Sequence, residues 1–380
     1  MSGDIEAWCD ETLPELYDGA MFDYEEASED VWEAVAAAME PLLEAIDDEE
    51  DRDRMADDLL DTARAWFRAH HDTVLELLEP VPVEQVTALC NQPQVAQHSA
   101  DWYAQRRNRL TASEFSQILD GRRGALLRQK LSTDTGDRVG FAAPVGISQE
   151  DGEMNATTWG HRFEPMVRRI YELEIAGPHT VNDGLGRFTH TTIPWLSASP
   201  DGLVVKGPLR GRLVEIKSPK TRQPGEFVPD EYYVQLQIQM EVCDLDAADF
   251  VEAQFAQRQV MDDSDDDACA KAAWKGRIEV RGHAEDSTTW RYRYSEPAED
   301  LEDVVFPADP GLEALPILES SVWWLVGWYP RTVLRNREWW DTVGWPNAQL
   351  FWAEVCSLRD QRVPAPDIIT HEVGWIGSNK

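Results

Sequence analysis

The chain has 380 residues, 42% of them hydrophobic, and a formal net charge of −36. The length predicts two or three domains with a sizeable buried core, and the overall charge excludes a general polyanion binder. The acidity is uneven, because residues 1–80 hold 26 acidic and 4 basic side chains (−22), whereas residues 101–240 hold 17 and 18 (+1). A near-neutral segment of an acidic chain can still present a local basic track.

The N-terminal residues 1–85 are predicted to form acidic helices. Val31–Met39 and Met55–Leu60 have helical spacing of apolar residues. Two interpretations of the acidic surface stay open: a solvated helical face, or a surface that docks a partner or mimics the charge of DNA. Val81-Pro82-Val83 marks a boundary after these helices.

The middle of the chain is predicted to alternate helices and strands. After Arg106, Arg107 and Arg109, the pattern Thr111-Ala112-Ser113-Glu114 begins a helix, and a loop is expected within 121–155. The later predictions are a helix at 159–175, strands at 186–192, 202–206 and 212–217, a helix at 231–243, and a strand at 247–256. This order suits an α/β sandwich with a mixed sheet.

The C-terminal part is rich in tryptophan. Strands are expected at 277–282 and 289–294, and Val322–Tyr329 and Thr332–Leu334 are expected to pair as two strands. One or two helices follow, and they carry Trp339, Trp340, Trp345, Phe351 and Trp352. Packing of these rings between helix and sheet is favoured over a platform on which bases stack.

The compartment is inferred from what the chain lacks. The N-terminus has no basic segment followed by an apolar one, as a signal peptide would, and no apolar run is long enough to span a membrane. The cysteines are odd in number and without CxxC spacing: Cys9, Cys90, Cys243, Cys269 and Cys356. We therefore expect an intracellular, reducing compartment and no membrane partner.

Two short peptides carry the clearest chemical signal. Ser199-Pro200-Asp201-Gly202-Leu203 is followed by Leu213-Val214-Glu215-Ile216-Lys217. Since side chains alternate along a strand, Glu215 and Lys217 share one face and Ile216 points to the other. Asp201 and Glu215 are thus expected to converge on a hard cation such as magnesium, with the Lys217 amine beside them. Nuclease chemistry needs this set, because water is activated next to a phosphodiester anion.

Two helices complete the pattern. Trp159-Gly160-His161-Arg162-Phe163-Glu164-Pro165 offers one more carboxylate, Glu164, and Tyr232-Tyr233-Val234-Gln235-Leu236-Gln237 offers two amides. Each peptide alone is a weak signal, since Asp-Gly is a common turn and Pro165 can mark a first helical turn. Their order along the chain is far more specific.

These motifs resemble the lambda-exonuclease or YqaJ-type viral recombinase nucleases, a branch of the PD-(D/E)XK superfamily. The resemblance spans roughly Asp101 to Val242, and it suggests a large DNA virus as source. It implies a restriction-endonuclease-like core, a mixed central sheet flanked by helices, at 95–260. An acidic helical region at 1–85 would precede this core, and a Trp-rich extension packed on it would follow at 261–380.

The resemblance also implies roles for single residues. Asp201, Glu215 and the Ile216 carbonyl would bind Mg²⁺ or Mn²⁺, and Glu164 would bind the metal directly, through water or at a second ion. Lys217 would orient the attacking water and help to deprotonate it. Gln235 and Gln237 match the glutamine motif, and the sequence leaves open which one faces the site. Arg106, Ser113 and Ser199 would hold a 5′-phosphate of DNA.

The expected function is a metal-dependent deoxyribonuclease, a 5′→3′ exonuclease on double-stranded DNA ends that leaves a 3′ single strand for recombination or repair. The alternatives are an endonuclease or nickase on the same core, a non-catalytic DNA-binding scaffold, and an RNA nuclease. A single-strand annealing protein is the expected protein partner. A homo-oligomer is also considered, because exonucleases of this kind can form rings around DNA.

Overall fold

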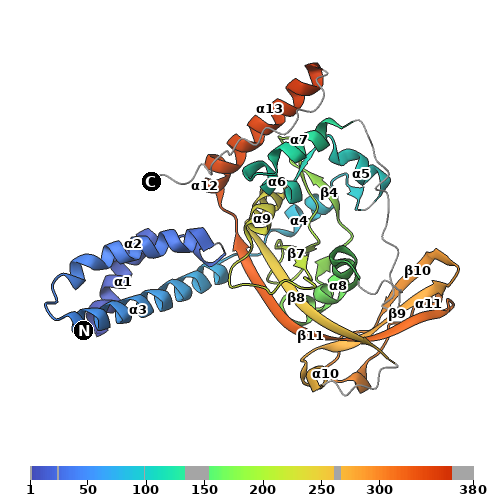
Figure 1. Cartoon of the computed structure of the whole chain (residues 1–380), viewed down its shortest axis with the longest axis horizontal. Helices are drawn as coiled ribbons and strands as arrows, with labels where there is room; N and C mark the ends of the chain where they lie inside the picture. Colours follow the sequence, from blue (N-terminus) through green and yellow to red (C-terminus); the bar gives the residue numbers. More distant parts are fainter. Residues whose placement is uncertain (1, 24, 98, 133–153, 261–266, 362–380) are drawn as a thin grey trace. The chain divides into compact units, whose positions relative to one another are not determined.

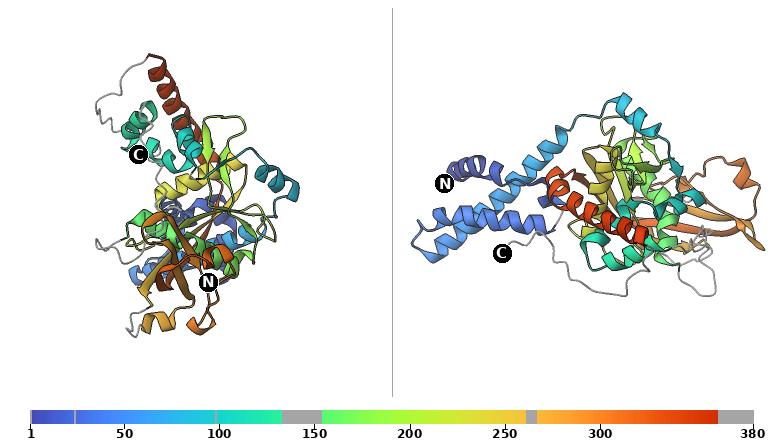
Figure 2. Two further views of the ribbon diagram at one scale, coloured as in Figure 1. Left: turned by 90° about the vertical axis from the view of Figure 1, so that its right-hand side faces the viewer. Right: turned by 90° about the horizontal axis from the view of Figure 1, so that it is seen from above.

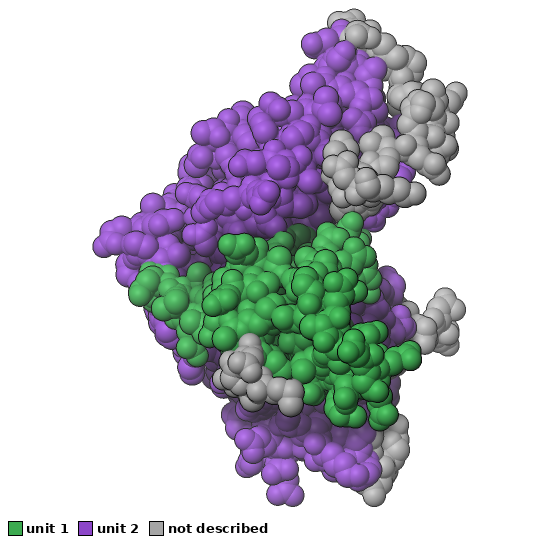
Figure 3. Space-filling model, turned by 90° about the vertical axis from the view of Figure 1, so that its left-hand side faces the viewer, with its two compact units in different colours: residues 1–80, 226–233 green, residues 81–225, 234–380 purple. Residues whose placement is uncertain are grey.

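The computed structural model describes residues 2–23, 25–97, 99–132, 154–260 and 267–361. The chain divides into two compact units, residues 1–80 with 226–233 and residues 81–225 with 234–380, coloured separately in Figure 3. Most of the loop predicted within 121–155, and most of the acidic run Asp262 to Asp267, lie outside the described residues.

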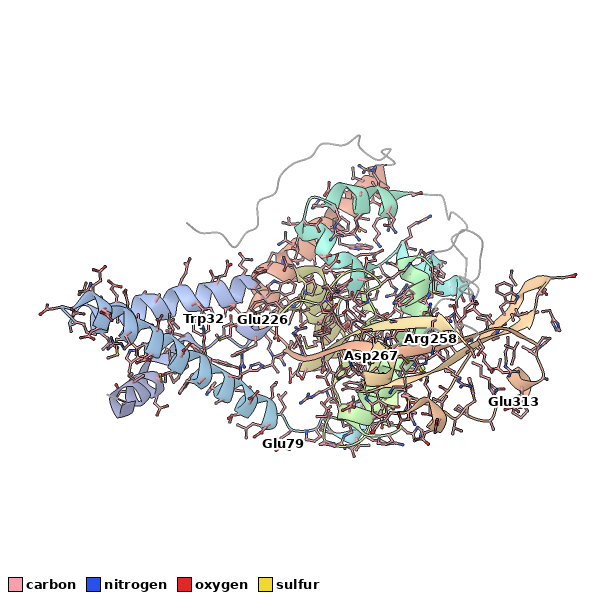
Figure 4. The ribbon with its side chains drawn as sticks, turned by 60° about the horizontal axis from the view of Figure 1, so that its bottom comes forward. Trp32, Glu79, Glu226, Arg258, Asp267 and Glu313 are labelled. Atoms are coloured by element: carbon pink, nitrogen blue, oxygen red, sulfur yellow. The ribbon has the colours of Figure 1, made fainter. Side chains whose placement is uncertain are left out.

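Three long helices form unit 1: α1 (Ser2–Leu16), α2 (Glu25–Leu43) and α3 (Glu49–Glu76), which lie side by side in Figure 2. The Asp48 carboxylate accepts from Asp51 N–H and caps α3 at its acidic first turn, where negative charge favours the helix dipole. Their apolar stripes meet in a core that contains Leu13, Val35, Leu59 and Phe67. Trp32, labelled in Figure 4, packs edge-on against Phe67.

Unit 2 carries the remaining helices together with two sheets. Its helices are α4 (Val83–Cys90), α5 (Ala100–Arg106), α6 (Ala112–Leu119), α7 (Arg123–Leu131), α8 (Ala156–Tyr171), most of α9 (Asp230–Cys243), α10 (Asp267–Lys271), α11 (Pro310–Glu313), α12 (Arg337–Trp339) and α13 (Trp345–Gln361). The helix start predicted at Thr111 is the N-terminus of α6. A capping box forms there, in which Thr111 and Glu114 each bond the other's backbone.

The first sheet has the order β1-β4-β5-β2, and the second has the order β10-β9-β11-β8-β7-β6-β3. The strands are β1 (Val95–Ala96), β2 (Leu110–Thr111), β3 (Val181–Asn182), β4 (Gly186–Thr189), β5 (Leu196–Ala198), β6 (Gly202–Val204), β7 (Leu213–Lys217), β8 (Ala247–Gln259), β9 (Lys275–His283), β10 (Asp286–Tyr294) and β11 (Ile317–Leu334). β7 runs parallel to β8 and antiparallel to β6. The predicted mixed α/β class is thereby confirmed.

The period of two along β7 sorts its side chains between the two faces. Val214 and Ile216 join the buried core with Phe163 and Val167 of α8, which packs on β7 and β8 (Figure 1). Glu215 bonds to α9 instead. Burial of each large apolar side chain in this core contributes about 1.5–3 kcal/mol. The face of β7 toward α8 therefore anchors the strand, and the face toward α9 carries Glu215.

The prediction of two paired strands at Val322–Tyr329 and Thr332–Leu334 is wrong. They belong to one strand, β11, which pairs with β8 along nearly its whole length. β9 pairs with β11 only up to Trp324. Pro330 lies beyond that point, on a part of β11 that does not pair with β9, so its missing N–H costs no hydrogen bond to β9. Figure 4 labels Arg258 on β8 and Asp267 at the start of α10.

None of the five cysteines takes part in a disulfide. None of the described helices combines the length and the apolar character needed to cross a membrane.

Candidate active site

Glu215 is the most completely bonded carboxylate of the predicted set. Its side chain is buried. Oε1 accepts from Lys217 Nζ, and it also accepts from Gln235 Nε2 at 2.6 Å, while Oε2 accepts from Gln239 Nε2 at 2.6 Å. Hydrogen bonds to an ionised carboxylate are among the stronger ones in proteins. The strand and α9 together therefore fix the orientation of this acid.

Asp201 lies on the turn before β6 and reaches across to β7. Its Oδ2 accepts from Ile216 N–H at 2.8 Å. Burial, followed by the charges of Glu215 and Glu164, raises the pKa of Asp201 well above its usual range, and Lys217 and the Ile216 N–H oppose this only in part. The structure therefore brings Asp201, Glu215 and Lys217 into one charged cluster.

Glu164 reaches the same cluster from α8. Its Oε1 accepts from Arg168 Nη2 at 2.9 Å, one helical turn further along. Burial and the charge of Glu215 raise the pKa of Glu164, against the lowering effects of Arg168, His161 and Lys217. The charges of Glu215 and Lys217 on β7 therefore both act on Glu164.

The three acids offer oxygen ligands, which Mg²⁺ and Mn²⁺ prefer. Among the described residues, however, no group of three or more His, Cys, Asp or Glu side chains has the geometry of a formed metal site. Lys217, Gln235, Gln239 and Arg168 instead bond the carboxylate oxygens. The oxygen donors are thus of the chemical kind that such a cation binds. Burial and neighbouring negative charge raise the pKa values of Asp201 and Glu164, and a divalent cation would offset that negative charge.

The two glutamines of the predicted motif go to different places. Gln235 bonds Glu215, but Gln237 Nε2 donates to Leu334 O at 2.8 Å and its Oε1 accepts from Asn336 N–H at 2.7 Å. Two residues along a helix turn a side chain by about 200°, so both cannot face β7. The second amide on Glu215 comes from Gln239, which the motif missed; its i,i+4 spacing from Gln235 is the signal that identifies it.

The predicted phosphate ligand Arg106 is bonded within the protein. Its Nε and Nη2 donate to Glu114 Oε1 at 3.3 and 3.1 Å. Glu114 Oε2 accepts from Lys130 Nζ and from Thr111 Oγ1, each at 2.7 Å. Burial raises the pKa of Glu114, but the charges of Lys130 and Arg106 and these hydrogen bonds outweigh it and lower the pKa. Arg106 is therefore paired with Glu114 before any phosphate binds.

Trp102 connects the other predicted phosphate ligands. The Arg106 guanidinium lies over the Trp102 ring, 5.4 Å from the ring centroid. Trp102 Nε1 donates to Ser199 Oγ at 3.2 Å. Ser113 Oγ lies 3.4 Å from Thr111 Oγ1, which in turn bonds Glu114. Arg106, Ser113 and Ser199 thus belong to one connected network, although α5, α6 and the β5–β6 turn supply them separately.

Comparison with known proteins finds a family match over the segment that carries these groups. Residues 101–246 match the family model described as the YqaJ-like viral recombinase domain. The resemblance predicted from the motifs is therefore confirmed for this segment.

A curated relative is an uncharacterized protein of Acanthamoeba polyphaga mimivirus, 27% identical over 178 residues. That match covers 42% of this chain and 29% of the relative, so the chain spans under a third of that protein's length.

Two solved exonuclease structures are also similar. An alkaline exonuclease from Laribacter hongkongensis matches at 19% identity and a TM-score of 0.40, over 70% of this chain and 96% of that one. A phage related exonuclease from Haemophilus somnus 129PT matches at 13% identity and a TM-score of 0.34, over 67% and 95%.

Proposed function

We propose that this protein is a divalent-metal-dependent deoxyribonuclease with a PD-(D/E)XK core, acting as a 5′→3′ exonuclease on double-stranded DNA ends in recombination or repair. The observation that carries the proposal is the grouping of Glu164, Asp201 and Glu215 with Lys217 in one electrostatic cluster. Burial and neighbouring negative charge raise the pKa values of Asp201 and Glu164, and acids perturbed in this way concentrate at functional sites.

In this proposal Glu164, Asp201, Glu215 and the Ile216 carbonyl hold Mg²⁺ or Mn²⁺. The ion supplies a lowered pKa for bound water and neutralises charge that grows on the phosphate. Gln235 and Gln239 of α9 fix the orientation of the Glu215 carboxylate through their hydrogen bonds to it. Lys217, whose side chain is one-quarter exposed, orients the attacking water and assists the removal of its proton.

Arg106, Ser113 and Ser199 are proposed to hold the 5′-phosphate of the DNA end. A guanidinium grips phosphate through two parallel hydrogen bonds. Because Glu114 pairs with Arg106, the carboxylate sets the direction of the guanidinium before DNA arrives.

A virus-related role in an intracellular, reducing compartment fits the family match. A single-strand annealing protein that takes up the 3′ strand, and a homo-oligomeric assembly, are part of the proposal. Unit 1, with its acidic helices, is proposed to be the surface that a protein partner docks on.

The direct test is digestion of end-labelled linear duplex DNA. We expect cleavage with Mg²⁺ or Mn²⁺, loss of all cleavage in EDTA, and faster digestion of 5′-phosphorylated than of 5′-hydroxyl ends. Cleavage of closed circular DNA would indicate the endonuclease or nickase instead. Binding without cleavage under every divalent metal would indicate a DNA-binding scaffold, and preference for an RNA duplex would indicate an RNA nuclease.

A second prediction compares two glutamines on α9. Gln239→Ala removes one of the donors that hold Glu215, and we expect cleavage to fall about 10- to 100-fold, as for other residues that orient metal ligands. Gln237→Ala is the matched control, because its amide bonds the backbone near Leu334 and leaves Glu215 untouched. Equal losses of cleavage rate in the two variants would contradict this assignment.

A further inference from the structure

Arg187, on β4, is a buried arginine with unsatisfied hydrogen-bond donors. Its exposed fraction is 2%. Nη1 donates to Trp102 O at 2.9 Å, whereas Nε and Nη2 are buried without an acceptor among the described residues. An unmade bond of a buried polar group costs about 1–3 kcal/mol, and more for a charged group. Stacking on the Trp102 ring offsets part of this cost, but the ring gives these two nitrogens no hydrogen-bond acceptor of the usual kind.

The surroundings of Arg187 are those of the predicted phosphate ligands. Its guanidinium lies over the Trp102 ring at 4.5 Å from the centroid, and that of Arg106 lies over the same ring at 5.4 Å. The Trp102 Nε1 bonds Ser199. Trp102 therefore ties Arg187 of β4 to Arg106 of α5 and to Ser199 of the β5–β6 turn.

The charge around Arg187 is strongly positive. Arg106, Arg109 and Glu114 all act on its pKa, which burial and then the charge of Arg106 lower to about 10. The charge of Arg187 in turn acts on the pKa of Lys130, which is bonded to Glu114. The four cations (Arg106, Arg109, Lys130, Arg187) less one carboxylate leave a local charge of +3 in a chain whose net charge is −36. An anion would offset this charge and bond the free donors.

We propose that Arg187 binds the terminal phosphate of a DNA end together with Arg106, and that Trp102 positions both guanidinium groups. This inference rests on the proposed function and adds a residue to it. A terminal phosphate fits better than an internal one, because a phosphate monoester carries up to two negative charges and an internal diester carries one. The dianionic monoester also matches the excess of charge and the arginine fork.

The test measures binding, without any need for hydrolysis. In a Glu215→Gln background with EDTA, fluorescence anisotropy gives the affinities for a 5′-phosphorylated duplex and for its 5′-hydroxyl counterpart. We expect Arg187→Gln to lower the affinity for the phosphorylated duplex at least tenfold, about 1.4 kcal/mol, and to leave the 5′-hydroxyl duplex nearly unchanged. Arg169→Gln is the control: it removes the same charge from α8, where the arginine pairs with Glu296.

An Arg187→Gln protein that keeps the full preference for a 5′-phosphate would overturn the inference, since a packing role on Trp102 alone lowers stability without changing the ratio of the two affinities. Thermal unfolding reports whether each variant folds. If Arg187→Gln does not fold, Arg187→Lys keeps the charge and removes the fork, and the same loss of preference is expected. If the parent protein, with Arg187 intact, binds both duplexes with equal affinity, the inference is also refuted. Cleavage assays remain independent, so a chain that digests DNA without this preference loses only the present inference.

Discussion

Lys217→Met is expected to reduce the rate of DNA cleavage by at least about 10³-fold while DNA binding is kept. Positioned groups that move protons contribute about 10²- to 10⁴-fold in enzymes, and Lys217 is the amine bonded to Glu215 in the cluster of three acids. Glu215→Gln should be at least as damaging, because it removes a charge from the proposed metal ligands. Single-turnover digestion of end-labelled duplex with saturating Mg²⁺ measures both effects.

Lys220→Met is the matched control for Lys217→Met. Lys220 follows the same strand, and its amine donates to Met154 O at 2.8 Å rather than to an acid of the cluster. The substitution removes the same charge just past the end of β7, so we expect a change of cleavage rate within about threefold, typical of a lost surface charge. Comparable losses in both lysine variants would mean that charge near the DNA, rather than proton transfer at Glu215, explains the effect.

The largest effect on stability is expected from Glu114→Gln. Glu114 and Lys130 are both buried, with exposed fractions of 2% and 1%, and their charges meet at 2.7 Å. Removing one partner of a buried ion pair leaves the other charge uncompensated, which costs about 3–5 kcal/mol. Urea unfolding followed by tryptophan fluorescence measures the loss.

The double variant Glu114→Gln/Lys130→Met separates charge from shape. With both charges gone, much of the lost stability should return, because a neutral pair of similar volume avoids the desolvation penalty. Arg106 would still lack its carboxylate partner. We therefore expect the double variant to fold well and yet to discriminate poorly between 5′-phosphate and 5′-hydroxyl ends. If the double variant is no more stable than Glu114→Gln, the ion pair is not the source of the loss.

The same pair predicts a dependence on pH. Because the folded state lowers the pKa of Glu114, the ionised carboxylate stabilises the fold fully above the ordinary glutamate pKa of about 4.3. This contribution is lost as the pH falls through the lower folded pKa. The difference in stability between the unsubstituted protein and Glu114→Gln should therefore shrink in acid and be constant near neutrality.

The local patterns of the sequence determined the elements that carry the proposed chemistry. The alternation in Leu213–Lys217 separates Glu215 and Lys217 from Val214 and Ile216, and the structure has this division. The apolar stripe of α8 and the capping box at Thr111 are equally local, since they depend on residues three or four apart. Patterns of this range need no knowledge of the neighbouring elements.

Only the tertiary structure decided which groups meet. It selected Gln239 over Gln237 as the second amide on Glu215, because the rotation of α9 about its axis depends on what packs against it. It also joined Val322–Tyr329 and Thr332–Leu334 into one long strand, β11, because β8 pairs with both segments and continues past the point where β9 ends.

The contacts of Arg106 and Arg187 show the same division. The sequence places Arg106 ahead of a helix start, but the buried Glu114–Lys130 pair that holds it, and the Trp102 ring it shares with Arg187, come together only when α5, α6, α7 and β4 pack. The periods of helix and strand act over a few residues and were therefore readable from the chain by itself. Which face meets which neighbour depends on the order of the strands and the packing of whole elements, and no local period encodes it.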